Sequence, residues 1–425
     1  MEHRFRRFPQ GFETVRYRTA APPAQGGHPA AKGKGGQQQV RPRSFLVGTQ
    51  NVLEGGDYDQ TLTNQLTGGS FTPWSLQATG WLAELIFYVT YTGTHASAPA
   101  LAANGPWNIF SNVELDDVNN EAIFGPFDGY VWFLINKMGG YLYYDDPATS
   151  PGYAFSLGTT TTFNFIMRLP LEIVNRDPLG PLASVNNTAS LTLKLIQNTT
   201  ATNAGPFSSN FPTATSVRVR GTQRFYWEPK KADKQGRPIQ GSPPASGTTQ
   251  YWTQGSVPVA AAGTINQQLI TGLGYPWRQY LFLLYDNSAP PSRANGETNW
   301  PDPILGLKFE ANMLLTQVNK LVWQQEMAQS YGMPSPVADA RAGAGSAVIP
   351  GKENGVYSLN WNRDFFLRKV GGETRRSYLV TSPGSNFIFN GAIGGAGNLY
   401  SIVNYVAPGG GSSAKNNTAA LTGGQ

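Results

Sequence analysis

Three tryptophans in the first half of the chain recur in the second half at nearly constant spacing. The recurring pairs are Trp81 and Trp277, Trp107 and Trp300, and Trp132 and Trp323. The offsets within the pairs are 196, 193 and 191 residues, and the segments around each pair match in character. Self-similarity at a fixed spacing indicates repeated structural units. The chain therefore predicts one module of roughly 190 residues used twice, with these tryptophans as structural anchors of the repeat.

Strand-like segments separated by polar turns fill both modules. They alternate apolar and polar residues and are rich in β-branched and aromatic side chains, which is typical of half-buried strands. The predicted segments are 159–174, 190–198 and 216–228 in the first half, and 356–370, 377–381, 386–390 and 398–407 in the second. The 49 glycines and 31 prolines supply turns between many short strands. Regularly spaced strands favour antiparallel β-sandwiches over βαβ units.

Each half also contains one segment with helical spacing. In 125–141, four apolar residues fall at i, i+3, i+4 and i+7, with Gly139 suited to the end of the helix. These four residues are Val131, Leu134, Ile135 and Met138. The segment 316–334 shows the same spacing, with Thr316 as the candidate N-cap. Its stripe consists of Val318, Leu321, Val322 and Gln325. We expect both stripes to pack in the core.

Composition divides the chain into five parts. They are a basic N-terminal arm (1–44), a first module (45–228), a linker rich in Lys, Gly, Pro and Ser (229–250), a second module (251–408) and a flexible C-terminal tail (409–425). The expected fold class is all-β, as two tandem β-sandwiches, each with a short inserted helix. The expected long loops are 93–106, 142–158, 199–215, 286–299 and 333–355.

The positive charge is concentrated in the N-terminal arm. The arm contains two acidic residues and nine basic ones: Arg4, Arg6, Arg7, Arg16, Arg18, Lys32, Lys34, Arg41 and Arg43. The whole chain has a net charge of +6, so the remainder is close to neutral at −1. Phenylalanines lie among the first arginines, which suits an element on an anionic surface. Two interpretations stay open: a solvated tail, or contact with lipid headgroups or packaged nucleic acid.

Several classes of protein are excluded or disfavoured by composition. The chain has no cysteine, which excludes disulfides and thiolate metal sites. No apolar run reaches the length of a membrane span, and the N-terminus lacks the apolar region of a secretory signal. Charged residues make up only 14% of the chain, and such neutral surface is easily buried against other subunits.

The residues that carry chemistry are sparse. The three histidines are His3, His28 and His95, and none belongs to a metal-binding or nucleophile motif. Three carboxylate groups, Asp57/Asp59, Asp116/Asp117 with Glu121, and Asp145/Asp146, lie next to turn residues, which favours surface turns over a glycosidase pair or a calcium site. We therefore expect no catalytic residues, no metal site and no cofactor.

The chain resembles the double jelly-roll major capsid proteins of tailless icosahedral viruses with an internal membrane, the tectiviruses and their relatives. The adenovirus hexon is a more distant relative. The resemblance implies an all-β fold of two tandem eight-stranded jelly-roll β-sandwiches with a short helix inserted in each. The segments that carry the resemblance are PWNIFSNVELDDVNNEAIFGPFDGYVWFL (106–134), 163–197 and 278–332, and it covers roughly residues 45–408 in pattern and order.

This resemblance implies a shell-building function. Three copies would form a capsomer with six similar towers, which would tile an icosahedral bacteriophage capsid assembled in the host cytoplasm. The implied partners are further copies of the chain, penton and minor capsid or membrane proteins, lipid headgroups of an internal membrane, and packaged DNA. Two alternatives remain. A carbohydrate-binding or glycan-hydrolysing sandwich would use the tryptophans as stacking platforms, and a nucleic-acid-binding module would depend on the basic arm.

Overall fold

The computed structural model describes most of the chain between residues 49 and 408. The described ranges are 49–76, 80–140, 146–173, 180–184, 190–227, 234–236, 248–270, 273–331, 353–362 and 377–408. The predicted arm and tail, and most of the predicted linker, lie outside these residues.

The first half folds into two sheets. One runs β1-β13-β4-β9-β8, with β10 also paired to β4, and the other contains β7-β6-β11-β2, with β3 also paired to β11. The strands are β1 (Asn51–Thr63), β2 (Gly69–Ser70), β3 (Trp74–Ser75), β4 (Gly80–His95), β5 (Ala100–Leu101), β6 (Phe110–Asp116), β7 (Ala122–Phe127), β8 (Ala154–Ser156), β9 (Thr160–Pro170), β10 (Leu182–Ser184), β11 (Thr192–Gln197), β12 (Phe207–Ser209) and β13 (Pro212–Tyr226). The helices are η2 (Trp107–Ile109), α1 (Gly129–Met138) and η3 (Pro147–Thr149).

The second half contains the sheets β19-β16-β21-β14 and β15-β20-β17-β18. Its strands are β14 (Thr248–Val259), β15 (Gly263–Gln268), β16 (Trp277–Asp286), β17 (Ile304–Phe309), β18 (Asn312–Val318), β19 (Val356–Asn360), β20 (Phe387–Ile393) and β21 (Gly397–Pro408). Its helices are α2 (Arg293–Asn299) and α3 (Lys320–Tyr331). β14 begins at Thr248, within the predicted linker, because Thr249 and Gln250 are buried and pair with β21.

Both halves have the same strand order. If β2 and β3 count as one interrupted strand, and β5, β8, β10 and β12 as additions, each half has eight main strands. One sheet then contains the first, eighth, third and sixth strands, and the other contains the second, seventh, fourth and fifth. This is jelly-roll topology, and the prediction of two tandem jelly rolls is confirmed. We call the two halves the first and second jelly rolls.

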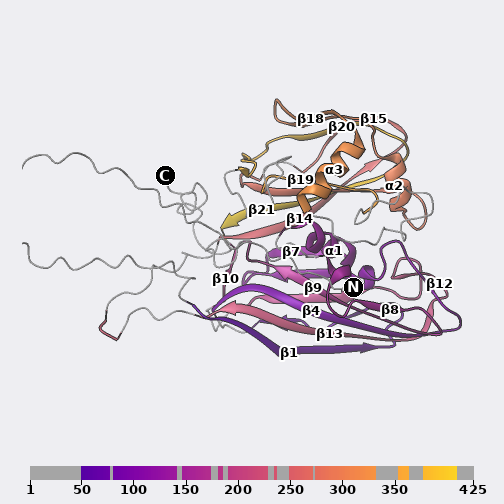
Figure 1. Ribbon diagram of the computed structural model, residues 1–425, viewed down its shortest axis with the longest axis vertical. Coiled ribbons are helices and arrows are strands. Elements are labelled where there is room, and N and C mark those ends of the chain that lie inside the picture. The colour runs from indigo at the N-terminus through magenta and orange to yellow at the C-terminus, as the bar shows by residue number, and fades with distance from the viewer. Residues whose placement is uncertain are drawn as a thin grey trace, which may run out of the picture. The chain divides into compact units, whose positions relative to one another are not determined.

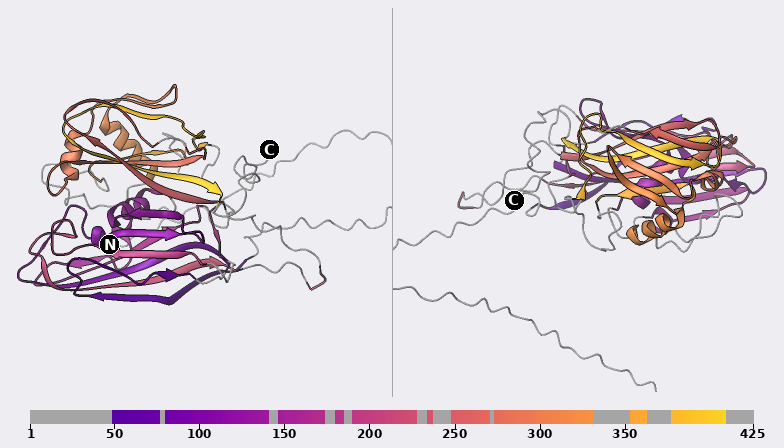
Figure 2. Two further views of the ribbon diagram at one scale, coloured as in Figure 1. Left: turned by 180° about the vertical axis from the view of Figure 1, so that it is seen from behind. Right: turned by 90° about the horizontal axis from the view of Figure 1, so that it is seen from above.

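Helix α1 lies between two layers: the sheet that contains β4, β9 and β13 is on one side, and β14 of the second jelly roll is on the other (Figures 1 and 2). A parallel pair between Phe124 of β7 and Trp252 of β14 joins one sheet of each jelly roll into a nine-stranded sheet.

The alternation of apolar and polar residues in the strands explains which of their side chains are buried. In β9, Phe163, Phe165 and Met167 point into the core, while the residues between them are half-buried.

Helix α1 lies where it was predicted. Its four stripe residues are all buried, and Asp128 caps the helix by accepting a hydrogen bond from the Val131 amide at 2.7 Å. Gly129 permits a close approach to η2, since a Cβ there would lie 1.9 Å from the Trp107 carbonyl oxygen.

The stripe predicted for the second helix is wrong. Thr316 lies in β18, and Asn319 accepts a hydrogen bond from the Leu321 amide, so α3 begins at Lys320. This start turns Trp323, together with Gln324 and Met327, into the core and leaves Leu321 and Val322 exposed. A similar local effect gives α2, which begins after the Ser292 cap in a segment predicted as loop (286–299).

One further strand prediction is wrong. In 377–381, Leu379 forms only an isolated bridge with Trp277.

Candidate functional site

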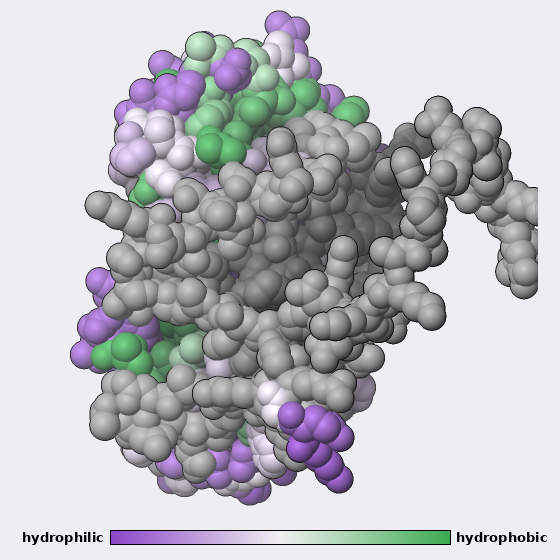
Figure 3. All heavy atoms as spheres, turned by 90° about the vertical axis from the view of Figure 1, so that its left-hand side faces the viewer, coloured by the Kyte–Doolittle hydropathy of each residue, from purple (hydrophilic) through white to green (hydrophobic). Residues whose placement is uncertain are grey.

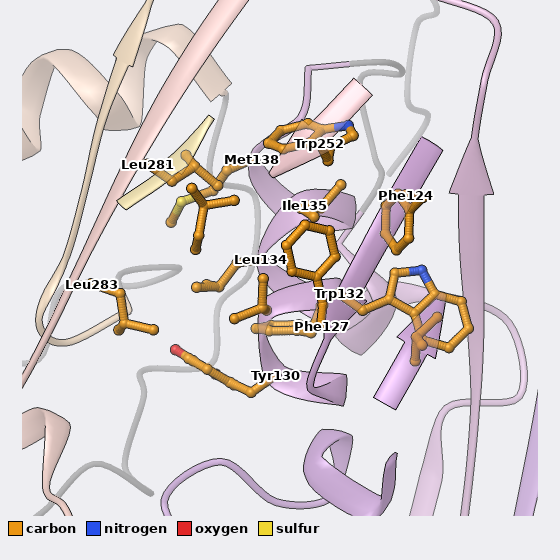
Figure 4. Packing of buried hydrophobic residues seen from close by; sticks show 14 of the residues in the cluster. Phe124, Phe127, Tyr130, Trp132, Leu134, Ile135, Met138, Trp252, Leu281 and Leu283 are labelled. Carbon is orange, nitrogen blue, oxygen red and sulfur yellow. The ribbon is translucent and has the colours of Figure 1, made fainter. Parts of the chain in front are cut away.

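The contact between the jelly rolls is built from helix α1 and one sheet of the second jelly roll. In Figure 4, Leu134 and Met138 of α1 lie opposite Leu281 and Leu283 of β16, with Trp252 of β14 close by. All five side chains are buried. We call this set the roll-to-roll contact. Its interior is apolar, so burial of these side chains stabilises the pairing of the two jelly rolls.

Hydrogen bonds from buried polar side chains surround the apolar centre. Gln279 of β16 donates to the Met138 carbonyl oxygen at 2.5 Å. Thr249 donates to the Gly180 carbonyl oxygen at 2.9 Å, which fixes the start of β14 against the first jelly roll. Because a buried polar group is costly without a partner, these bonds specify one arrangement of the two rolls.

A buried charged cluster lies at the edge of the same contact. Lys137 Nζ of α1 lies 2.7 Å from Glu353 Oε1 and 3.3 Å from Asp146 Oδ2. Burial alone would lower the pKa of Lys137, but the two carboxylates outweigh it and raise that pKa. Asp146 was predicted to lie in a surface turn. It is instead buried, because it caps η3 and pairs with Lys137.

Arg293 of α2 extends the cluster across the contact. Its Nε donates to Asn104 Oδ1 at 2.7 Å, and its Nη1 lies 3.5 Å from Glu353 Oε2. The guanidinium also lies 4.3 Å from the centre of the Tyr130 ring. Two cations and two carboxylates therefore meet across the jelly rolls. The cluster was not predictable from the sequence, because its members are distant in the chain and no motif links them.

Two of the three recurring tryptophan pairs occupy matching places. The first pair does not, because Trp81 lies two residues before the register shift of its strand at Ala83, whereas Trp277 lies one residue before the shift at Arg278. Trp81 lies at the start of β4 and Trp277 at the start of β16, Trp107 and Trp300 each precede the fourth strand, and Trp132 and Trp323 lie in α1 and α3. All six are buried, so they do not form an exposed stacking surface for a glycan. The indole nitrogen of Trp132 donates to the Arg168 carbonyl oxygen and that of Trp323 to the Ser358 carbonyl oxygen, both at 2.7 Å.

The pairing registers identify equivalent residues on the two third strands. Ile86 pairs with Arg168 and Thr222, and Leu281 pairs with Ser358 and Ile402. Each lies three residues after the residue that is skipped in the pairing with the eighth strand, Ala83 in β4 and Arg278 in β16, so Ile86 and Leu281 hold the same position.

The same registers extend the equivalence to the first strands. Leu53 pairs with Arg224 two residues along from Thr222, and Trp252 pairs with Asn404 two residues along from Ile402. Leu53 is thus the counterpart of Trp252. Leu53 is 62% exposed, whereas Trp252 is 2% exposed within the roll-to-roll contact.

The helices show the complementary difference. Counting from Trp132 and Trp323, Leu321 and Val322 of α3 match Tyr130 and Val131 of α1. Tyr130 and Val131 are buried, while Leu321 and Val322 are 56% and 53% exposed. The face of α3 that carries Leu321 and Val322 is thus exposed, whereas the corresponding face of α1 is buried.

Exposed apolar residues are concentrated on the second jelly roll. Among the described residues, six of the nine large exposed hydrophobic side chains belong to it: Leu273, Leu305, Met313, Leu321, Val322 and Val380. On the face drawn in Figure 3, a patch of hydrophobic residues also lies over the second jelly roll. Residues of this kind gathered on one surface are typical of interaction sites.

The matching outer sheet face of the first jelly roll is more polar. Glu84 lies 2.8 Å from Arg224 and 3.3 Å from Arg168, and Arg220 lies 4.7 Å from the centre of the Tyr88 ring. Together with Leu53 and Ile86, these residues form a mixed apolar and charged surface, which we call the outer face.

Two remaining candidate residues, His95 and Asp117, form hydrogen bonds with backbone groups of the same chain. His95 is buried at the end of β4, with Nδ1 2.5 Å from the Asn210 carbonyl oxygen. Asp117 Oδ1 accepts hydrogen bonds from the amides of Asn119 and Glu121, which is turn chemistry as predicted, but the Asp116 and Asp117 side chains are buried rather than at the surface.

No group of three or more His, Asp or Glu side chains in the described residues could hold a metal ion. No helix within the same ranges is long and apolar enough to cross a membrane. The nine basic residues predicted to contact lipid or nucleic acid all lie outside the described residues.

Two solved structures share the fold. The crystal structure of the STIV MCP is 12% identical, with a TM-score of 0.53 over 84% of this chain and 97% of that chain. The atomic structure of Sulfolobus Turreted Icosahedral Virus is also 12% identical, with a TM-score of 0.56 over 87% of this chain and 93% of that chain. These are double jelly-roll major capsid proteins, and the predicted double jelly-roll fold is confirmed. No protein-family model and no curated protein sequence matches the chain.

Proposed function

We propose that this protein is a major capsid protein that trimerises into capsomers with six similar towers and tiles an icosahedral shell. The observation that carries the proposal is the uncovered helix face of the second jelly roll. Its counterpart in the first jelly roll is buried by the next sheet in the chain. The helix of the first jelly roll is covered by the second jelly roll, but the helix of the second has no such cover. A second copy of the chain could therefore cover it in the same way.

The proposed contact joins α3 of one copy to the outer face of the next. Leu321 and Val322 would take the places of Tyr130 and Val131, and Leu53 would take that of Trp252. The contact is heterologous, since two different surfaces meet, and such contacts produce rings when the rotation closes. Closure at three copies gives six contacts of one kind, as the resemblance to capsid proteins implies.

Size-exclusion chromatography with light scattering tests the proposal. The wild-type chain is expected at about three times its 46.0 kDa mass. The double variant L321D/V322D is expected to be monomeric, because it places two charges in the centre of the contact. Since the contact has two sides, L53D should weaken the trimer as well.

The matched control is V118D, which introduces the same charge at another exposed valine. It should remain trimeric. A wild-type chain that is monomeric at micromolar concentration would contradict the proposal, and so would a trimeric L321D/V322D variant.

The N-terminal arm would hold the shell to its contents. Its nine basic residues suit an anionic membrane surface or packaged DNA, and the phenylalanines among them favour lipid. Deletion of 1–44 should leave the trimer intact and abolish salt-sensitive binding to vesicles containing anionic lipid. If the deletion abolishes the trimer instead, the arm has a structural role, and if only DNA binding is lost, its partner is the genome.

A further inference from the structure

Two strand edges join the jelly rolls inside the chain, and the corresponding two edges are free. β7 is the fifth main strand of the first jelly roll and β14 is the first main strand of the second, and they pair in parallel at Phe124 and Trp252. The fifth strand of the second jelly roll is β18, and the first strand of the first jelly roll is β1. Among the described residues, β18 pairs only with β17, and β1 pairs only with β13. Each of these strands therefore has one unpaired edge, which can hydrogen-bond to another strand.

The fourth strands provide a common reference for β7 and β18. Each fourth strand skips one residue in its pairing with the seventh strand, Ser111 in β6 and Leu305 in β17. Leu115 and Phe309 each lie four residues after the skipped residue. They therefore hold the same position in the two jelly rolls.

The residue of β18 that corresponds to Phe124 follows from this reference. Leu115 pairs with Phe124, and Phe309 pairs with Asn312. In both hairpins, the next two residues of the fourth strand oppose three of the fifth, so the same bulge accompanies both pairs. Phe124 is buried beside β14, whereas Asn312 is exposed. The partner expected for Asn312 is Leu53, the counterpart of the residue that pairs with Phe124.

The two free edges permit only a short ladder. Inside the chain, Pro126 of β7 has no backbone N–H, and the ladder to β14 is a single pair. β18 has Leu314 at that place, and its amide can donate. On β1, the regular pairing with β13 shifts after Gly55, which limits a ladder on the other edge as well. The residues that can pair are therefore 53–55 and 312–314.

We propose that β18 of one copy pairs in parallel with β1 of the next, with Asn312 opposite Leu53. The inference rests on the proposed trimer and adds backbone hydrogen bonds to the contact between α3 and the outer face. Every junction between jelly rolls, within a copy or between copies, would then contain a joined sheet. Because a slip of one residue turns each side chain to the other face of a sheet, this pair would fix the level of neighbouring copies along the strands.

Disulfide crosslinking of the purified trimer tests the inference. The chain has no cysteine, so L53C/N312C introduces two thiols without a background. Paired residues on neighbouring strands lie about 4.8 Å apart, within the Cα range of a disulfide. β1 and β18 lie at opposite ends of the molecule (Figure 1), so a disulfide between them joins two copies. After oxidation, we expect covalent dimers and trimers in non-reducing SDS electrophoresis, and monomers again after reduction.

The matched control is L53C/T316C. Thr316 is also an exposed residue of β18, but it lies four residues further along the strand. The distance from the paired position is about 13 Å at roughly 3.3 Å per residue, which exceeds the range of a disulfide. The yield of crosslinked chains should therefore be at least about tenfold lower than with L53C/N312C.

Hydrogen exchange of the wild-type trimer gives a second measurement that needs no variant. β15 (Gly263–Gln268) is also an edge strand in the described part of the chain and serves as the reference. An edge strand leaves about half of its amides unpaired, and these exchange rapidly. The amides of 51–55 that do not bond to β13 should exchange at least about tenfold more slowly than the free amides of β15.

The possible failures separate this inference from the proposed function. A trimer in which L53C/N312C does not crosslink would overturn the strand pair and leave the trimer standing. Equal crosslinking by L53C/T316C, or exchange of 51–55 as rapid as that of β15, would do the same. A monomeric wild-type chain would overturn the proposed function, and the strand pair with it.

Discussion

Replacing Arg293 by methionine tests whether the buried charged cluster holds the two jelly rolls together. The substitution keeps a long side chain but removes a guanidinium that is fully buried. The substitution removes the 2.7 Å bond to Asn104, the bonds to the carbonyl oxygens of Asn354 at 3.3 Å and Ala103 at 2.5 Å, and the 3.5 Å ion pair with Glu353. It also removes the contact of the guanidinium with the Tyr130 ring. The buried carboxylate of Glu353 then has one cationic partner instead of two.

The expected loss can be worked out from these contacts. Removing one partner of a buried ion pair costs about 3–5 kcal/mol in the free energy of unfolding. Glu353 retains Lys137 at 2.7 Å, which moves the expectation to the lower end, about 3 kcal/mol. That loss is roughly a hundredfold in the unfolding equilibrium, a large share of the 5–15 kcal/mol that stabilises a typical domain.

Urea unfolding followed by circular dichroism and tryptophan fluorescence measures this loss. E353Q should also destabilise the chain, and R293M/E353Q should lose less than the sum of the two single variants, by at least about 1 kcal/mol. The matched control is R218M, which breaks the exposed ion pair with Asp59 and should leave the midpoint unchanged. An R293M variant within about 0.5 kcal/mol of wild type would refute the reasoning, as would strict additivity.

Two further predictions concern the core. W132F and W323F each remove an indole hydrogen-bond donor at 2.7 Å and should each lower the free energy of unfolding in urea by about 1–3 kcal/mol. W132F should lie at the lower end, because Asn136 still donates to the same carbonyl oxygen. A W323F variant as stable as the wild type would contradict this prediction. Burial raises the pKa of Tyr405 to about 12, so its neutral phenol stabilises the fold fully below pH about 10, and this contribution is lost as the pH rises toward 12. Absorbance at 295 nm and circular dichroism should show late phenol ionisation coinciding with unfolding, and normal titration in an intact fold would exclude it.

The sequence predicted those features that depend on local pattern. Alternation placed β9, β11 and β21, and helical spacing placed the buried stripe of α1, because strand and helix faces follow directly from residue order. The repeated tryptophans indicated two modules, and the two strand orders agree.

Features that depend on a short cap or on distant partners were not predictable in this way. Asn319 and Ser292 each set the start of a helix, and a shift of a few residues changed which side chains of α3 face the core. The buried charged cluster forms only after both jelly rolls have folded, so no spacing pattern in the sequence indicates it. Its members are Lys137, Asp146, Arg293 and Glu353.

The joining of β7 to β14 has a consequence for how the two kinds of contact can differ. Inside one chain, the partner surfaces are tethered, so they meet at a high effective concentration and never separate by dilution. Natural selection can then fill that contact with tryptophan and leucine and make it permanent. In the proposed contact between copies, a surface built around Leu53 and arginines would have to stay soluble until a neighbouring copy arrives, and a misplaced copy would have to be able to leave. Covalent linkage would thus allow two similar contacts to differ in strength, with a lasting one inside each chain and a reversible one between the chains of the proposed trimer.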